Sequence, residues 1–183
     1  MKKIISFLLI AFVITGCSCS FKMDESSPKK KVEEFLNNYQ TLSDDVKIQL
    51  DNVIDRELTF NDSQKEEYRE IMSQHYKDLK YEIKDEVIDG DNATVTVEIE
   101  VKDYSKIMQE SEIYMQDNQS EFQNDEGIYD ISLYNDYRLK KLKEANDKIK
   151  YTLNLTLTRV DGKWQMNNLS ETDEEKIQGI YNH

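Results

Sequence analysis

The stretch ATVTVEIEV, residues 93–101, places an apolar side chain at every second position and a polar one between them. Successive side chains of a β-strand point to opposite faces of the sheet, so this alternation is typical of a strand with one buried and one solvent-exposed face. The turn-forming residues DGDN precede it at 89–92, and a similar alternation begins before that turn. The apolar positions of the earlier run are Tyr81, Ile83 and Val87. The sequence therefore predicts a β-hairpin with strands at 81–88 and 92–103.

A second hairpin is predicted near the end of the chain. The run YTLNLTLT (151–158) repeats the alternation, and Asp161-Gly162 is a tight-turn dipeptide. The chain then returns as KWQM (163–166), in which Trp164 and Met166 share the inward face. We expect strands at 150–160 and 163–168, and hence a sheet of about four strands. The predicted core comprises Val95, Val97, Ile99, Leu153, Leu155 and Trp164, packed against Phe35 and Leu36.

Three helices are predicted before the first hairpin. Ser27-Pro28 is an N-cap followed by proline at the first helical position. Ser43 or Asp44 caps the second helix, and Ser63 with Glu66 has capping-box spacing at the start of the third. Apolar residues recur at helical spacing in all three segments. These inward positions are Val32, Phe35, Leu36 and Tyr39; Val46, Leu50, Val53 and Ile54; and Tyr68, Ile71, Met72, His75, Tyr76 and Leu79.

Three lysines, Lys29, Lys30 and Lys31, lie in the first turn of the first helix. Cations there oppose the helix dipole by roughly 0.3–1 kcal/mol each at low salt. One interpretation is a solvated turn whose charge is offset by neighbouring acids. The other is a basic foot that contacts anionic lipid, where each lysine contributes about 1 kcal/mol. The neighbouring acids are Asp24, Glu25, Glu33 and Glu34.

Residues 104–150 separate the two hairpins and are predicted to form a helical insert. We expect a helix at 106–116, a polar loop at 118–127 and a second helix at 128–148, and Ser170 caps a short final helix. The insert is rich in aromatic residues, which favours either a cleft for a sugar or peptide or, more commonly, core plus an amphipathic rim. Its tyrosines are Tyr104, Tyr114, Tyr129, Tyr134 and Tyr137.

This order of elements predicts an α+β fold, with N-terminal helices packed on a curved antiparallel sheet of about four strands and a helical insert between the two hairpins. Residues 28–183 would form this single domain. The segments IDGDNATVTVEIEV (88–101) and RVDGKWQMNNL (159–169) resemble the hairpins of nuclear-transport-factor-two-like (cystatin-like) extracytoplasmic domains. The chain as a whole is similar to lipoproteins of low-GC Gram-positive bacteria. The resemblance implies a sheet that wraps the first helix; the long insert departs from the compact family pattern.

The first residues have the order of a secretory signal peptide. Lys2 and Lys3 are followed by an apolar run from Ile4 to Ile14, interrupted only by a serine, and then by small residues. The run is shorter than the ~20 apolar residues that span a bilayer. The residues ITGC (14–17) resemble the lipobox of bacterial lipoproteins, as opposed to an ordinary signal peptide with a chance cysteine. The resemblance implies removal of residues 1–16, a diacylglyceryl group on Cys17 and attachment to the cell membrane on the side facing away from the cytoplasm. Residues 18–27 are mostly polar and have no periodic pattern, so we interpret 17–27 as the lipidated cysteine and a flexible tether.

Composition narrows the possible functions. The formal charge is −13, and residues 1–16 contain two lysines and no acid, so the mature chain carries −15. This charge argues against a nucleic-acid partner, since phosphate binding needs clustered lysine and arginine. Only Cys17 and Cys19 are present, and the mature chain has only His75 and His183, so neither a disulfide framework nor a cysteine or histidine metal site is expected. The acids at 89–91 lack the spacing of an EF-hand loop. We expect no metal and no cofactor.

The chain also lacks the usual motifs of catalysis, including G-x-S-x-G, the P-loop and H-E-x-x-H. We therefore expect no catalytic residues and a non-catalytic binding or protein-interaction domain of the cell envelope, with an envelope protein, peptide or wall fragment as its ligand. The alternatives are a small cleft-type enzyme that uses His75 or a buried acid as a base, or a passive envelope component. A lone histidine on an apolar helix face is more often a buried, hydrogen-bonded core residue than a ligand.

Overall fold

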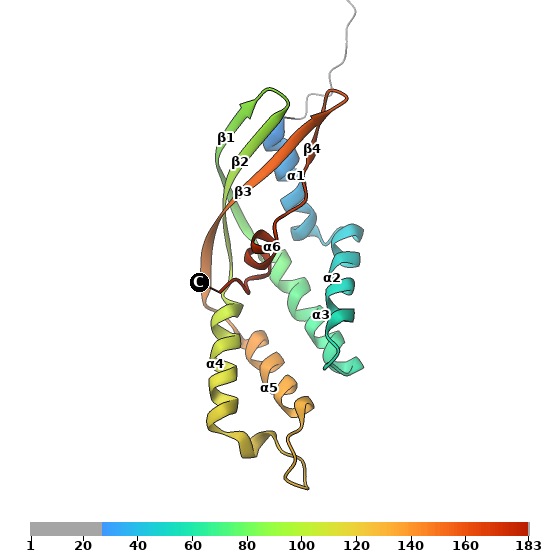
Figure 1. Ribbon diagram of the computed structural model, residues 1–183, viewed down its shortest axis with the longest axis vertical. Coiled ribbons are helices and arrows are strands. Elements are labelled where there is room, and N and C mark those ends of the chain that lie inside the picture. Colours follow the sequence, from blue (N-terminus) through green and yellow to red (C-terminus); the bar gives the residue numbers. More distant parts are fainter. Residues whose placement is uncertain (1–26, 183) are drawn as a thin grey trace, which may run out of the picture.

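The computed structural model describes residues 27–182. In this range it contains six α-helices and one four-stranded antiparallel sheet, which confirms the predicted α+β class (Figure 1). The signal peptide, Cys17 and most of the tether lie outside the described residues. The helices are α1 Pro28–Thr41, α2 Asp44–Arg56, α3 Asp62–Lys77, α4 Tyr104–Asp117, α5 Ile131–Glu144 and α6 Glu171–Gln178; the strands are β1 Lys80–Asp89, β2 Asn92–Lys102, β3 Lys148–Val160 and β4 Lys163–Met166.

The sheet has the order β1-β2-β3-β4, and each of its two central strands contributes a row of alternating buried residues to the core. β2 and β3 pair in unbroken register from Asn92↔Thr158 to Lys102↔Lys148, so the inward residues of both strands lie side by side. All six predicted strand residues of the core are buried, as is Leu36 of α1. Phe35 is only partly buried, because it lies at the edge of the core beside a cleft.

A β-bulge in β1 overturns the prediction that Val87 faces inward with Tyr81 and Ile83. The register shifts between Ile83 and Asp85, and from there on each side chain points to the opposite face. Val87 therefore pairs with outward-facing Thr94 and is 57% exposed. Glu86, opposite Val95, takes the inner face instead; it remains exposed, and its carboxylate accepts a hydrogen bond of 2.7 Å from the backbone N–H of Lys29. An acidic side chain of the sheet thus satisfies the positive end of α1, whose first turn holds no acid of its own.

The caps of the first helices follow the predicted chemistry with one exception. Ser27 caps α1 and Ser43 caps α2, each through its hydroxyl oxygen. The expected Ser63–Glu66 capping box is wrong: α3 begins earlier, and Asn61 and Gln64 form the box. The two side chains satisfy each other's backbone N–H groups at 3.0 and 3.1 Å.

The insert has two helices, as predicted, with different bounds. α4 begins earlier than expected because Asp103 accepts from the backbone N–H of Lys106. α5 is shorter than the predicted 128–148 because Asp130 caps it and residues before the cap form a bridge between Gln123 and Tyr129. The expected loop at 118–127 contains a short 3₁₀ turn, Gln119–Phe122. The last strand ends at Met166 rather than 168, and Ser170 caps α6 as predicted.

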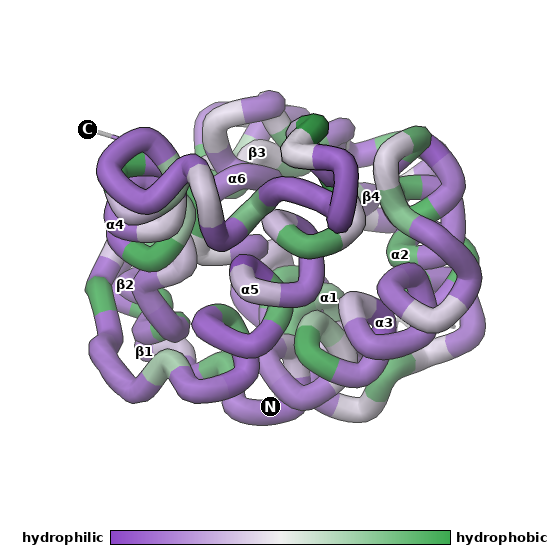
Figure 2. The backbone as a smooth tube through the Cα atoms, turned by 90° about the horizontal axis from the view of Figure 1, so that it is seen from below, coloured by the Kyte–Doolittle hydropathy of each residue, from purple (hydrophilic) through white to green (hydrophobic). Residues whose placement is uncertain are grey.

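The molecule is elongated, with the sheet and α1 at one end and the α4–α5 pair at the other (Figure 1). Viewed along this axis, α5 lies between α4 and α3, and the outer backbone is mostly hydrophilic (Figure 2). Asn135 of α5 is fully buried and donates to the main-chain oxygen of Thr59 at 2.9 Å, while Gln64 of α3 donates to Asp136 at 2.7 Å. These bonds attach the insert to the N-terminal helices. None of the helices between residues 27 and 182 is both long and apolar enough to cross a membrane.

Candidate functional site

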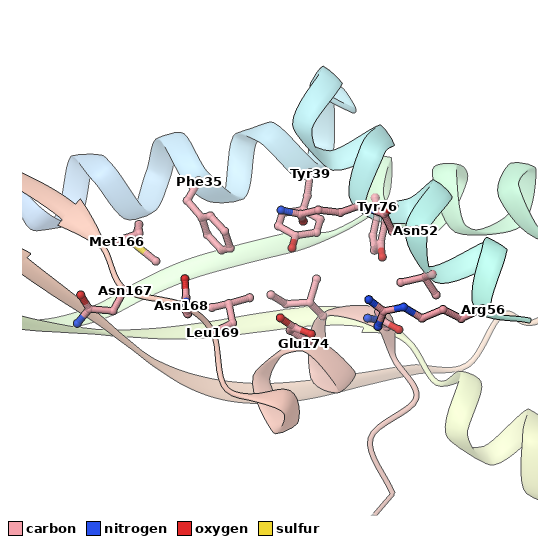
Figure 3. Close-up of a pocket in the computed structure, with 14 residues that line it drawn as sticks. Phe35, Tyr39, Asn52, Arg56, Tyr76, Met166, Asn167, Asn168, Leu169 and Glu174 are labelled. Carbon is pink, nitrogen blue, oxygen red and sulfur yellow. The ribbon is translucent and has the colours of Figure 1, made fainter.

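A cleft of about 590 Å³ opens between the N-terminal helices and the segment that joins β4 to α6 (Figure 3). Its volume lies within the range of roughly 300–1,000 Å³ that is usual for small-molecule sites. One wall comes from α1 and α2, and the other from residues 166–169 and α6. The lining residues are Phe35, Tyr39, Gln49, Asn52, Val53, Arg56, Tyr76, Met166, Asn167, Asn168, Leu169, Glu174, Ile177 and Gln178.

Three aromatic rings form the apolar part of the cleft. Phe35 and Tyr39 of α1 meet edge to face at 5.4 Å, and Tyr39 meets Tyr76 of α3 in the same way at 5.1 Å. Such contacts fix the rings, and each adds about 0.5–1.5 kcal/mol beyond the burial of area. Figure 3 shows both tyrosine hydroxyls directed into the cleft.

The two hydroxyls stay protonated at neutral pH. Burial, followed by the negative charge of Glu174, raises the pKa of Tyr39 to about 12. Burial also raises the pKa of Tyr76, with smaller contributions from other tyrosines and Glu174. Each hydroxyl can therefore donate a hydrogen bond to a ligand in the cleft.

Part of the polar lining of the cleft comes from one stripe of α2. Gln49, Asn52, Val53 and Arg56 are spaced i, i+3, i+4, i+7, so they share one face of the helix. This face lies beside the buried stripe of Val46, Leu50 and Ile54, which packs on the core. The position of the cleft residues therefore follows from the packing of the apolar stripe.

Two residues in the cleft carry charge, and they lie on opposite walls. Arg56 is the last residue of α2, where a cation is favoured by the helix dipole, and Glu174 is in α6. Within residues 27–182, neither makes an ion pair. Amide side chains lie on both walls of the cleft. The cleft thus offers a cationic donor, an anionic acceptor, neutral amides and aromatic faces to one ligand.

His75 lies outside the cleft and is the buried, hydrogen-bonded core residue that its helical position predicted. It is 1% exposed, stacks on Tyr104 with ring centroids 4.7 Å apart, and its Nε2 lies 2.9 Å from the main-chain oxygen of Ile177. Because that oxygen can only accept, Nε2 carries the hydrogen. Burial lowers the pKa of His75 to about 4.

The five tyrosines of the insert do not line this cleft. Tyr104 is in the core, and Tyr114 stacks on Tyr137 at 4.7 Å around buried Phe122. Tyr129 is 48% exposed. Tyr134 lies elsewhere, beside Arg138. The aromatic residues of the cleft therefore come from α1 and α3, and not from the insert.

Sequence reasoning did not identify Arg56, Glu174 or the pair Asn167-Asn168 as site residues. The sequence places the polar residues of α2 on one helix face, but a polar helix face usually points to solvent and does not by itself indicate a binding site. Asn167 is held in place by β3, because its side chain donates to Thr156 and accepts from Thr158 at 3.1 Å each.

No group of three or more potential metal ligands comes together in the described part of the chain. The acids of the β1–β2 turn, which could suggest a calcium site, are exposed.

Comparison with known proteins gives one match. Residues 1–18 match the model of the prokaryotic membrane lipoprotein lipid attachment site, and Cys17 lies in this range. The match supports a lipid-anchored membrane lipoprotein. No curated protein matches the chain, and no solved structure does either.

Proposed function

We propose that this lipoprotein is a non-catalytic binding domain on the outer side of the cell membrane, and that its cleft binds a peptide or wall fragment of the cell envelope. The curved sheet packed against α1 is compatible with the nuclear-transport-factor-two-like resemblance, which we keep as part of the proposal. The observation that carries it is the lining of the cleft, where fixed aromatic rings lie beside neutral amides and two unpaired opposite charges.

This lining suits an extended ligand with many hydrogen-bonding groups. Asparagine and glutamine each offer both donors and an acceptor, as do peptide bonds and acetylated sugars. Aromatic faces supply contact area for apolar parts of such a ligand at little entropic cost. Arg56 can bind a carboxylate through two parallel hydrogen bonds, and Glu174 can accept from an amine or a hydroxyl.

The same lining supports a binding role over a catalytic one. Its 14 residues include no histidine, cysteine, serine, threonine or lysine, and only one carboxylate. A pair of carboxylates, or a nucleophile beside a base, is the usual minimum for hydrolysis. No aspartate or glutamate among residues 27–182 is buried, and His75 is enclosed in the core away from the cleft. The proposed alternative, an enzyme with His75 or a buried acid as base, therefore has no support in the cleft.

The arrangement also suits a lipid anchor. α1 begins at the end of the molecule that holds both hairpin turns, and the tether to Cys17 precedes α1 (Figure 1). A flexible tether of ten residues would have a root-mean-square span of about 15–20 Å. The cleft, between α1, α2 and α6, then stands clear of the lipid head groups.

Binding is tested by calorimetry and thermal unfolding of the lipidated protein in detergent. The probes are a soluble disaccharide-tetrapeptide wall fragment, its free tetrapeptide and its free disaccharide. A ligand at 100 times its dissociation constant adds about 2.7 kcal/mol to stability. For a domain of this size this raises the melting temperature by roughly 5–10 °C. We expect at least one probe to reach this shift and to be recovered unchanged.

Arg56→Gln and Glu174→Gln are the informative variants because each keeps size and removes one charge. We expect either to weaken binding roughly tenfold or more, the loss of one charge-assisted contact. Lys47→Gln, on the exposed side of α2, is the matched control and should bind as the wild type does. The proposal fails if none of the probes binds, which favours a passive envelope component, or if a probe is turned over, which favours an enzyme.

A further inference from the structure

Two of the four arginines in this acidic chain have no carboxylate partner among residues 27–182. Arg69 pairs with Asp51 at 2.8 Å, and Arg159 lies 4.0 Å from Asp91. Arg56, without such a partner, lines the cleft described above. The other unpaired arginine, Arg138 of α5, lies at a different place in the molecule, between α4, α5 and the segment after α6.

Arg138 is held by aromatic rings instead of an acid. Its guanidinium carbon lies 5.1 Å from the ring centre of Phe60 and 5.9 Å from that of Tyr134. Cation–π contacts of this kind position a guanidinium but use none of its N–H donors, which lie in the plane of the guanidinium. The side chain is therefore oriented and still able to bind a carboxylate through two hydrogen bonds.

Two adjoining cavities meet at Arg138. The outer one has a volume of about 280 Å³ and the inner one about 40 Å³, and both are lined by Met108, Arg138 and Ile180. Apart from Glu57 and Arg138, the inner cavity is lined by aromatic and aliphatic side chains, of which Phe60, Tyr104 and Leu142 are buried. It has room for roughly three water-sized groups, which is the size of a small branched hydrocarbon.

The mouth of the outer cavity is polar and closed on one side by the C-terminal segment. Gln109 of α4 donates to the side chain of Asn182 at 2.8 Å, which holds that segment against α4. Glu112 of α4 lines the same cavity and makes no ion pair within the described chain. The hydroxyl of Tyr134 is acted on by both charges: burial raises its pKa, Arg138 lowers it and Glu112 raises it. A positive and a negative group thus lie around one ring.

The presence of charges of both signs favours one kind of ligand. A simple anion at Arg138 would also meet the carboxylates of Glu57 and Glu112, and a simple cation would meet the unpaired guanidinium. A molecule that carries both charges satisfies Arg138 and Glu112 together. We propose that the two cavities bind a zwitterion of amino-acid size, whose carboxylate accepts from Arg138, whose ammonium group donates to Glu112 and whose small branched side chain enters the inner cavity.

Four probes of known chemistry separate these contacts: L-valine, N-acetylvaline, which lacks the ammonium charge, valinamide, which lacks the carboxylate, and glycine, which lacks the side chain. Calorimetry of the lipidated protein in detergent at millimolar probe concentration should show binding of valine. Each of the other three should bind roughly tenfold more weakly or worse, because each lacks one contact.

Arg138→Gln should abolish the preference for valine over valinamide. Glu112→Gln should abolish the preference for valine over N-acetylvaline. Glu112 is exposed, so its substitution leaves the fold intact even if Arg138→Gln destabilises it. Arg56→Gln is the matched control: it should weaken binding of the cleft ligand and leave valine binding unchanged. Absence of valine binding by the wild type overturns the proposal, as does equal binding of valine by the wild type and by Glu112→Gln. Neither result bears on the cleft between α1 and α6.

Discussion

The Nε2 atom of His75 lies 2.9 Å from the main-chain oxygen of Ile177, and this buried hydrogen bond joins α3 to α6. Tyr76, the next residue of α3, is one of the three aromatic residues of the cleft, while Glu174 of α6 lies on its opposite wall. A bond in the core therefore sets the separation of two groups that we assign to ligand binding. Substitutions at His75 should alter the cleft indirectly, through stability and spacing, and not through chemistry at the ligand.

The protonation of His75 should make stability depend on pH. Its pKa is about 4 in the folded protein and about 6.5 in the unfolded chain, so the unfolded chain takes up the proton first as pH falls. The contribution of neutral His75 to the free energy of unfolding is fully present above about pH 6.5 and is lost as pH falls toward 4. We expect a loss of about 2 kcal/mol between pH 7.5 and 5, measured by urea unfolding.

The variant His75→Gln separates this effect from the titration of carboxylates. Glutamine keeps an N–H donor but does not titrate, so the variant should be less stable at pH 7.5 and nearly independent of pH between 6.5 and 5. A variant as sensitive to pH as the wild type in this window would show that His75 does not cause the dependence.

Gly179 should tolerate no side chain. It ends α6 with φ +71°, and a Cβ atom there would lie 2.2 Å from the main-chain oxygen of Lys102 and 2.9 Å from Cε1 of His75. Gly179→Ala should cost roughly 2–4 kcal/mol from backbone strain and overpacking together. Gly162→Ala is the matched control, since φ is +77° and nothing lies within 4 Å of the added atom. Its cost should be limited to about 1–2 kcal/mol. Equal melting temperatures for the two variants would contradict the proposed packing.

The sheet could be predicted from sequence because its signal is local and periodic. The alternation at 93–101 and at 151–158 determines which side chains face the core, and the pairing of Val95 with Leu155 follows. The bulge in β1 carries no such signal. It inserts one residue without any glycine or proline to mark it, and it brings Glu86 to the start of α1, 57 residues away in sequence.

The cleft was harder to predict than the fold because its residues come from elements that meet only in the tertiary structure. Arg56 and Glu174 are ordinary exposed charges in the sequence, and only the packing of α2 and α6 brings them to opposite walls of one cavity. Tyr39 and Tyr76 were correctly placed on apolar helix faces, but their hydroxyls reach the edge of the core. The ends of α5 were predicted poorly for a similar reason, since a side-chain cap at Asp130 outweighs the apolar pattern before it.

The hydrogen bond from the backbone of Lys29 to Glu86 predicts that the sheet stabilises α1. Glu86→Ala removes a negatively charged acceptor at this helix end, and we expect a loss of roughly 0.5–1.5 kcal/mol in urea unfolding. Asp89→Ala, an exposed acid on the same strand without an ion pair in the described chain, should change stability by less than about 0.5 kcal/mol. Raised salt should reduce the difference between the two variants, because the charge contribution is screened. Equal effects of the two substitutions would contradict a stabilising bond between Glu86 and the start of α1.

Membrane attachment should depend on Cys17 alone. Within residues 27–182 no helix is suited to cross a membrane, and the mature chain carries −15, which opposes adsorption to anionic lipid. One acyl chain gives only marginal and reversible binding, whereas a diacylglyceryl group supplies the two chains that stable anchoring needs. Cys17→Ser should therefore leave the protein unprocessed at the lipobox or release it to the medium, measured by fractionation and by the mass of the N-terminal peptide. Cys19→Ser is the matched control and should stay in the membrane fraction. A Cys17→Ser protein that is processed after residue 16 and remains membrane-bound would show that some other part of the chain holds it there.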